Sequence, residues 1–163
     1  MWHLYFDASA LVKRYSQEPG ASLVDEAFSL IPAEQMMISA LGILEVASIL
    51  RRMRNDGRLP VALYKQVVAE FNNEVIMSGR FLTPEINNQI ALSALSLISK
   101  HNLNASDVII LRSAINTQNA LRQQGDDLML WTSDKRLVRA AIAEVLTVFN
   151  PESDSIARLQ QLL

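Results

Sequence analysis

Cysteine is absent from this 163-residue sequence. Its absence excludes a disulfide framework, a zinc–thiolate site and a cysteine nucleophile. Histidine is scarce as well, because His3 and His101 are the only two, and they are too widely separated to suggest a zinc site. We expect His3 to be a strand residue and His101 a loop residue.

Long apolar runs and a large excess of either charge are also missing. No apolar run approaches the roughly 20 residues that a membrane helix needs, and the N-terminus does not resemble a signal peptide. We therefore expect a cytoplasmic protein that does not enter a membrane. The formal net charge of -2 gives no global electrostatic case for nucleic-acid binding, which would need a local basic surface. Length and composition fit one globular domain with a real core.

The first residues predict a buried strand followed by a helix. The segment 2–6 is a short, mostly apolar run, typical of a strand that is buried on both faces of a parallel sheet. Asp7 ends this run, and Ser9 is a good N-cap for a helix that continues to Tyr15. Ligands of open α/β sheets bind at the carboxyl ends of the strands, where Asp7 stands. Capping of the helix by Asp7 is the alternative interpretation.

The same pattern recurs near the end of the chain. The segment 128–132 predicts a buried strand, Asp134 follows it, and residues 135–143 predict a helix. Asp134 alone could be a helix cap. Because parallel strands bring their carboxyl ends to one edge of a sheet, we expect Asp134 and Asp7 to lie near each other.

Two further acids lie on the inward faces of predicted helices. Glu45 has apolar residues one turn away on either side in the helix at 41–50. A buried acid is costly unless it is paired with an arginine or bound to a cation. Asp107 lies in the first turn of a helix that Ser106 is predicted to cap, and apolar residues again follow one turn later. An aspartate in a first turn is also common for helix-dipole reasons alone.

The other predicted elements complete an α/β domain. We expect one domain at residues 1–150, with residues 151–163 forming a C-terminal tail or short helix of the same domain. The sequence predicts helices at 21–30, from Pro60 and from Thr83 to about Ser99, strands at 36–39, within 75–82 and at 145–149, and a short terminal helix within 155–163.

The acids Asp7, Glu45, Asp107 and Asp134 are thus expected at one edge of the sheet. Four carboxylates in one pocket repel each other strongly, so a stable fold gathers them only with a cation. Oxygen ligands without His or Cys favour Mg²⁺ or Mn²⁺. Such ions bind substrate phosphates, which suggests metal-assisted hydrolysis of a phosphodiester.

Together these motifs resemble a PIN-domain protein, and in particular the VapC-like ribonuclease toxins. The resemblance rests on the segment 6–13, the helix that carries Glu45, the segment 106–109 and the segment 132–137. It implies a three-layer α/β/α fold around a central parallel sheet and an RNA endonuclease activity that depends on Mg²⁺ or Mn²⁺. It also implies a homodimer and an antitoxin protein whose tail covers the site.

Carried over by position, the resemblance gives the acids individual roles. Asp7 and Asp107 would be direct metal ligands. Glu45 would complete the ligand set or orient a water, and Asp134 would bind the metal directly or through water. Ser9 and Thr132 would be polar groups that support these ligands. Asp126 and Asp127 match nothing in the family's site and are interpreted as turn residues.

A local basic rim is the sequence's one candidate RNA-binding surface. It would consist of Arg14, Arg51, Arg52 and Arg54. The alternative is that the arginines at 51–54 form a solvated helix end that complements the helix dipole.

Other functions fit the motifs less well. A haloacid-dehalogenase-type phosphatase normally needs a second Asp two residues after the first, where this chain has Ser9. A receiver domain needs an acidic pair near the end of its first strand. A PIN-like binding or assembly module without significant catalysis remains an alternative, as does an RNA-processing nuclease that is not a toxin. Metal-dependent cleavage would distinguish a nuclease from the binding module. A neighbouring antitoxin gene, or growth arrest on expression, would distinguish a toxin from the RNA-processing nuclease.

Overall fold

A four-stranded parallel sheet forms the centre of the computed structural model, which describes all 163 residues. The strand order is β2-β1-β3-β4, and every neighbouring pair is parallel. The α/β class and the three-layer arrangement predicted from the sequence are confirmed. The strands are β1 (Trp2–Phe6), β2 (Met36–Met37), β3 (Asp127–Trp131) and β4 (Thr147–Phe149).

Alternating strand residues divide the core into two layers. In β1, Leu4 and Phe6 belong to one apolar cluster, whereas Tyr5 belongs to the other. In β3, Met129 and Trp131 join the first cluster, and Leu128 and Leu130 join the second. This alternation follows from the two-residue period of a strand. It explains why the central strands are apolar on both faces and why helices cover the sheet on each side.

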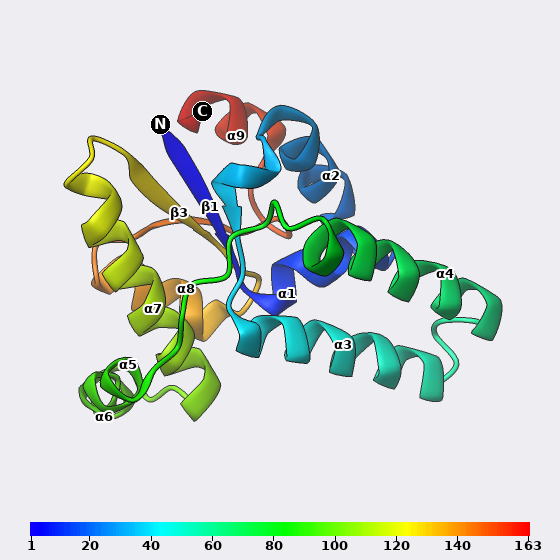
Figure 1. Cartoon of the computed structure of the whole chain (residues 1–163), viewed down its shortest axis with the longest axis horizontal. Coiled ribbons are helices and arrows are strands. Elements are labelled where there is room, and N and C mark those ends of the chain that lie inside the picture. Colours follow the sequence, from blue (N-terminus) through cyan, green and yellow to red (C-terminus); the bar gives the residue numbers. More distant parts are fainter.

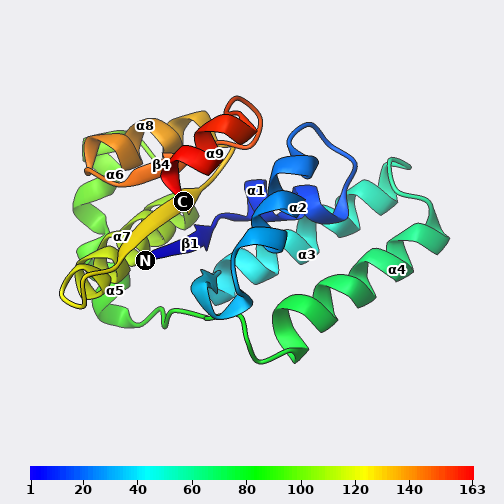
Figure 2. The same cartoon turned by 90° about the horizontal axis from the view of Figure 1, so that it is seen from above.

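The two helical layers come from different parts of the chain (Figures 1 and 2). The first apolar cluster packs under α1–α4 and α9, and the second under α6–α8 and Ala94, which joins α5 to α6. The helix α3 lies beside α4 in both views. The helices are α1 (Ala8–Leu11), α2 (Ala21–Leu30), α3 (Ala40–Asn55), α4 (Val61–Phe71), α5 (Asn88–Ser93), α6 (Leu95–His101), α7 (Ala105–Arg122), α8 (Lys135–Ala143) and α9 (Ile156–Leu162), with 3₁₀ turns at Val12–Tyr15 and Ala33–Gln35 and a π-helical segment at Asn72–Met77.

The region between α4 and α7 differs from the prediction. No strand forms within 75–82; the π-helical segment continues α4, and only Leu82 makes an isolated bridge, to Met37 of β2. The helix predicted from Thr83 begins only after Asn87, whose side chain caps α5, and it is divided from α6 at Ala94. His101 ends α6 instead of lying in a loop.

The C-terminal residues pack against the first apolar layer. Leu159 of α9 is fully buried in the same cluster as Phe149 of β4. The buried Lys13 donates a hydrogen bond to Glu152 over 2.5 Å. These contacts hold the C-terminal segment against β4 and against the 3₁₀ turn that follows α1. Both chain ends lie on the same side of the molecule (Figure 1). No helix of the structure combines the length and the apolar character that crossing a membrane requires.

Candidate active site

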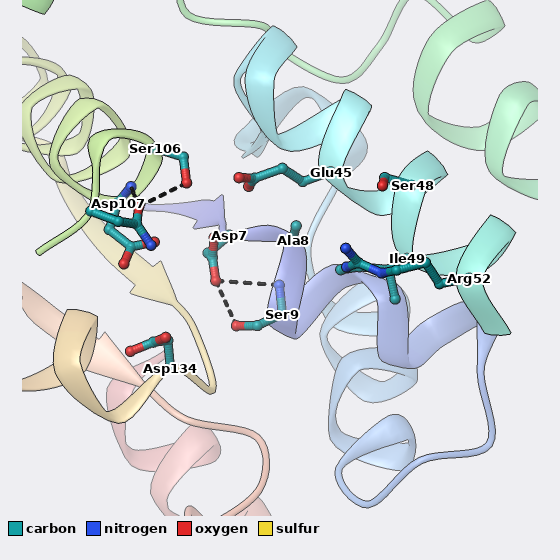
Figure 3. A pocket seen from close by; sticks show the side chains of 11 residues that line it. Asp7, Ala8, Ser9, Glu45, Ser48, Ile49, Arg52, Ser106, Asp107 and Asp134 are labelled. Carbon is teal, nitrogen blue, oxygen red and sulfur yellow. Dashed lines mark hydrogen bonds between the residues drawn. The ribbon is translucent and has the colours of Figure 1, made fainter. Parts of the chain in front are cut away.

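The four acids singled out from the sequence line one pocket, although they come from four elements. The pocket has a volume of about 260 Å³. Figure 3 shows Asp7 in its middle, with Glu45 on one side and Asp107 and Asp134 on the other. It lies at the carboxyl ends of β1 and β3, beside the starts of α1, α7 and α8. Its lining residues are Asp7, Ala8, Ser9, Glu45, Ser48, Ile49, Arg52, Asn104, Ser106, Asp107 and Asp134.

Asp7 ties the two central strand ends together. It is the N-cap of α1, so the prediction that Ser9 caps this helix is wrong. Its Oδ2 accepts hydrogen bonds from the Ser9 backbone N–H (3.2 Å), the Ser9 hydroxyl (2.5 Å) and the Thr132 hydroxyl (3.0 Å). The Ser133 backbone N–H in turn donates to the Ser9 hydroxyl (2.9 Å). Ser9 and Thr132 therefore hold Asp7 by one oxygen, and its Oδ1 accepts from neither.

Asp134 is arranged in the same way. It is the N-cap of α8, where its Oδ1 accepts hydrogen bonds from the backbone N–H groups of Arg136 (2.7 Å) and Leu137 (3.0 Å). Its Oδ2 takes no part in these bonds. The capping interpretation and the ligand interpretation are therefore compatible, because each carboxylate caps a helix with one oxygen and leaves the other for the pocket.

The backbone of Asp107 is held by Asn104, which the sequence does not mark as a site residue. The N-cap of α7 is Asn104, not Ser106 as predicted; its Oδ1 accepts from the Asp107 backbone N–H (2.9 Å) and from the Ser106 hydroxyl (3.0 Å). Asn is as good a cap as Ser, and its position three residues before Asp107 was the available signal. Asp107 is only 9% exposed, and its Oδ2 is buried without a hydrogen-bond partner.

Burial and mutual repulsion raise the pKa of three of these carboxyls. Burial is the main cause for Asp7, which is 5% exposed, and for the half-buried Glu45, whose pKa the charge of Asp7 raises further. The pKa of Asp107 rises to about 6 through burial and then through the charges of Asp134, Asp7 and Glu45, whereas Arg136 lowers it. The pocket therefore holds more negative charge than its surroundings stabilise.

These properties fit a hard divalent cation. The lining carboxylates offer oxygen ligands only, and the buried Asp107 Oδ2 has no other partner. As the side chains lie, no three acidic or histidine residues are close enough together to form a complete set of ligands. Gathering them around an ion therefore requires some side chains to move. The Glu45 and Asp107 carboxylates, which cap no helix, are the ones that can do so while Asp7 and Asp134 keep their capping bonds.

Of the four arginines predicted to contact RNA, only Arg52 lines the pocket. Arg51 and Arg54 lie outside it on the same helix. Arg14 donates to Glu74 (2.6 and 2.8 Å) and Asp25 (2.8 Å), and its guanidinium also lies over the Phe28 ring at 4.1 Å.

Arg14 therefore holds α2 against the π-helical segment after α4, and the structure does not place it at the site.

The two acids interpreted as turn residues have structural partners. Asp126 lies in the turn and pairs with the N-terminal amine at 2.9 Å. The prediction that Asp127 is a turn residue is wrong, because Asp127 is the first residue of β3. Its carboxylate accepts hydrogen bonds from the side chains of Gln118 and Arg122. Neither lines the pocket.

The raised pKa of Asp107 predicts how stability changes with pH when divalent ions are removed. The folded protein holds the proton up to about pH 6, whereas the unfolded chain releases it near the ordinary value of 3.8. Between these values the folded state binds more protons, so the Asp107 contribution to the free energy of unfolding falls as pH rises and is constant above about 6.

Urea unfolding of the wild type and of Asp107→Asn in EDTA measures this contribution. We expect the variant to be more stable by about 1 kcal/mol at pH 7, a value reduced for solvent screening. The difference should shrink at pH 4.5. An equal difference at both pH values would contradict the assignment to Asp107.

Comparisons with known proteins identify a matching family and two solved structures with a similar fold. A family model described as the PIN domain matches residues 4–149. The crystal structure of FitAcB from Neisseria gonorrhoeae is similar with a TM-score of 0.58 and 22% sequence identity, over 93% of this chain and 99% of that one. The crystal structure of PAE2754 from Pyrobaculum aerophilum is similar with a TM-score of 0.63 and 19% identity, over 99% of this chain and 98% of that one. No curated protein matches the sequence.

Proposed function

The chain belongs to the PIN-domain family, and on that premise we propose that it is an endoribonuclease that hydrolyses RNA phosphodiester bonds with the help of Mg²⁺ or Mn²⁺. One observation carries the proposal: carboxylates from four separate elements face one pocket, although their mutual repulsion destabilises the protein without a cation. A fold without a use for a cation would gain stability by replacing at least one of them.

Asp7 and Asp107 would hold the ion directly, and Glu45 and Asp134 would complete its surroundings. The assignment of Asp7 and Asp107 rests on their burial and on the unbonded Oδ2 of Asp107. A bound divalent ion would lower the pKa of a water molecule and stabilise the negative charge that develops on the phosphate.

The side chains around the proposed ion site would hold the ligands in place and accept a proton from the attacking water. Ser9 and Thr132 fix the Asp7 carboxylate by hydrogen bonds to one of its oxygens. Glu45 is half-buried and has a raised pKa, so it is suited to accept a proton from the attacking water. Asp134 is fixed by its bonds to the start of α8. The pocket is therefore pre-organised on the side of Asp7 and Asp134.

The proposed biological role is that of the toxin of a toxin–antitoxin pair. The VapC-like spacing of the motifs supports this role, and the cognate antitoxin and a second copy of the chain would be its protein partners in the cytoplasm. Growth arrest on expression, relieved by a small protein encoded next to this one, would support the role. Normal growth together with metal-dependent cleavage of RNA would instead indicate an RNA-processing nuclease.

Cleavage of a mixed RNA pool that includes tRNA is the experiment that tests the nuclease. The purified protein is incubated with Mg²⁺, with Mn²⁺ or with EDTA, and the products are separated on a denaturing gel. We expect discrete fragments with either ion and intact RNA with EDTA. RNA that stays intact under every condition would contradict the proposal and favour a binding module.

A further inference from the structure

Basic side chains without an acidic partner are concentrated on α3 and α8, the helices that carry Glu45 and follow Asp134. Seven of the chain's lysines and arginines form ion pairs elsewhere in the structure. The unpaired ones include a group of three on α3 and another group of three on α8. These six are Arg51, Arg52, Arg54, Lys135, Arg136 and Arg139.

On α3, one arginine of the three faces the pocket. Glu45, Ser48 and Arg52 are spaced by three and four residues, so they lie along one face of the helix, and all three line the pocket. Figure 3 shows the Arg52 side chain extending toward Ala8 and Ser9, on the side of Asp7 opposite to Asp134. Arg52 is exposed and pairs with no acid, even though Glu45 lies on the same face.

On α8, Arg136 is the basic residue that is bonded to one of the acids. Its backbone N–H donates to Asp134, so this residue begins at the rim of the pocket. Its side chain is exposed and forms no ion pair, yet its charge is near enough to lower the pKa of the Asp107 carboxyl. Arg136 does not itself line the pocket, but its backbone is bonded to Asp134, which lies across Asp7 from Arg52 (Figure 3).

An RNA strand that crosses this pocket needs cationic contacts on both walls. The acids repel phosphate groups, and a bound ion offsets this repulsion only at the phosphate that it touches. An exposed guanidinium that is not committed to a carboxylate can donate two hydrogen bonds to a phosphate. Arg52 and Arg136 meet these conditions on α3 and α8, respectively.

We propose that Arg52 and Arg136 bind the RNA phosphates on the two sides of the phosphodiester that is cut. This inference rests on the proposed nuclease function and deepens it. It replaces the rim predicted from the sequence, of which it retains Arg52, and it adds a residue from the helix that follows Asp134. The two arginines are substrate-binding residues, and they do not take part in the proton transfers.

Steady-state cleavage of a single-stranded RNA in Mg²⁺ tests the proposal with Arg52→Ala, Arg136→Ala and the double variant. We expect each single substitution to raise KM about tenfold, the size of a lost charge-assisted hydrogen bond, with a smaller change in kcat. The double variant should raise KM by about the product of the two effects. Lys65→Ala removes the same charge from exposed α4 and should leave KM unchanged.

Arg51→Ala is the sharper control, because it removes an exposed, unpaired arginine from the position next to Arg52. We expect its effect on KM to be clearly smaller than that of Arg52→Ala. Equal effects of Arg51→Ala, Arg52→Ala and Lys65→Ala would overturn the proposal, since they would indicate only a general effect of charge.

Measuring RNA binding distinguishes failure of this proposal from failure of the nuclease function. The affinity for a fluorescent single-stranded RNA is measured in the Asp7→Asn background as salt is varied. Each arginine substitution should lower the salt dependence by about 0.7 in the log–log slope, the value for one phosphate contact on a single strand.

If wild-type protein cuts no RNA but the slopes change in this way, the nuclease function fails and the two phosphate sites stand. If the protein cuts RNA and neither KM nor the slopes respond, the nuclease stands and the two phosphate sites are overturned. If the protein neither cuts nor binds RNA, both are overturned.

Discussion

Asp7→Asn is expected to abolish RNA cleavage and to leave the protein folded. Asp7 contributes a proposed metal ligand at the centre of the pocket, and Asn cannot supply the negative charge. Metal-ion catalysis contributes several kcal/mol of transition-state stabilisation, so the loss in kcat/KM should be about a thousandfold or more.

The same substitution is expected to maintain or increase stability in EDTA at pH 7.5. Burial raises the pKa of the Asp7 carboxyl in the folded protein, so holding it charged at this pH disfavours folding. The amide oxygen of Asn can accept the hydrogen bonds from Ser9 and Thr132 that now end on Oδ2. The variant therefore removes a charge without removing the bonds that join β1 to β3.

Cleavage assays and urea unfolding of the same preparations measure both expectations. Asp56→Asn is the matched control, because it makes the same chemical change at an exposed carboxylate next to the end of α3. It should leave cleavage unchanged. Cleavage by Asp7→Asn at the wild-type rate would exclude Asp7 as a metal ligand, and loss of cleavage together with unfolding would leave its role structural.

The sequence predicts which acids share the pocket, because short-range patterns place them. A strand that is buried on both faces is apolar throughout, so the polar residues that follow it mark the carboxyl edge of the sheet. Asp7 and Asp134 were found by this rule, and the parallel pairing of β1 with β3 brings them to one pocket. Glu45 was found because an acid interrupts the apolar face of a helix.

For Asp7 and Asp134 the sequence leaves helix capping and ligand binding as alternatives. In the structure the two roles are compatible. A carboxylate has two oxygens, and a cap uses one of them. A helix start that is capped by Asp also holds that side chain in a fixed position. The hydrogen bond that caps the helix therefore also orients the second carboxylate oxygen toward the pocket.

The errors fall where tertiary contacts decide local structure. The sequence of segment 75–99 does not indicate that Leu82 forms a single bridge to Met37. It also does not indicate that the helix begins only after Asn87. Arg14 follows the first motif closely in sequence, but its partners, Glu74 and Asp25, come from other elements. Partners that are distant in sequence cannot be assigned from the spacing of residues.

Millimolar Mg²⁺ or Mn²⁺ is expected to raise the melting temperature of the wild type. An ion that binds only the folded pocket stabilises it by about 2.7 kcal/mol when its concentration is 100 times Kd. For a chain of this length each kcal/mol corresponds to about 2–4 °C, so the expected increase is about 5–10 °C. Differential scanning calorimetry in EDTA and in increasing Mg²⁺, at constant ionic strength, measures it.

Asp107→Asn should remove most of this increase, because the Asp107 Oδ2 is the buried carboxylate oxygen that has no hydrogen-bond partner in the protein. The two effects have opposite signs: the variant should melt above the wild type in EDTA and below it in saturating Mg²⁺. Such a crossing cannot arise from a general change in stability, which would shift both curves in one direction. Asp56→Asn should follow the wild type at every concentration. An equal increase in the wild type and in Asp107→Asn would place the stabilising ion elsewhere on the protein and would remove the physical reason for gathering four acids in this pocket.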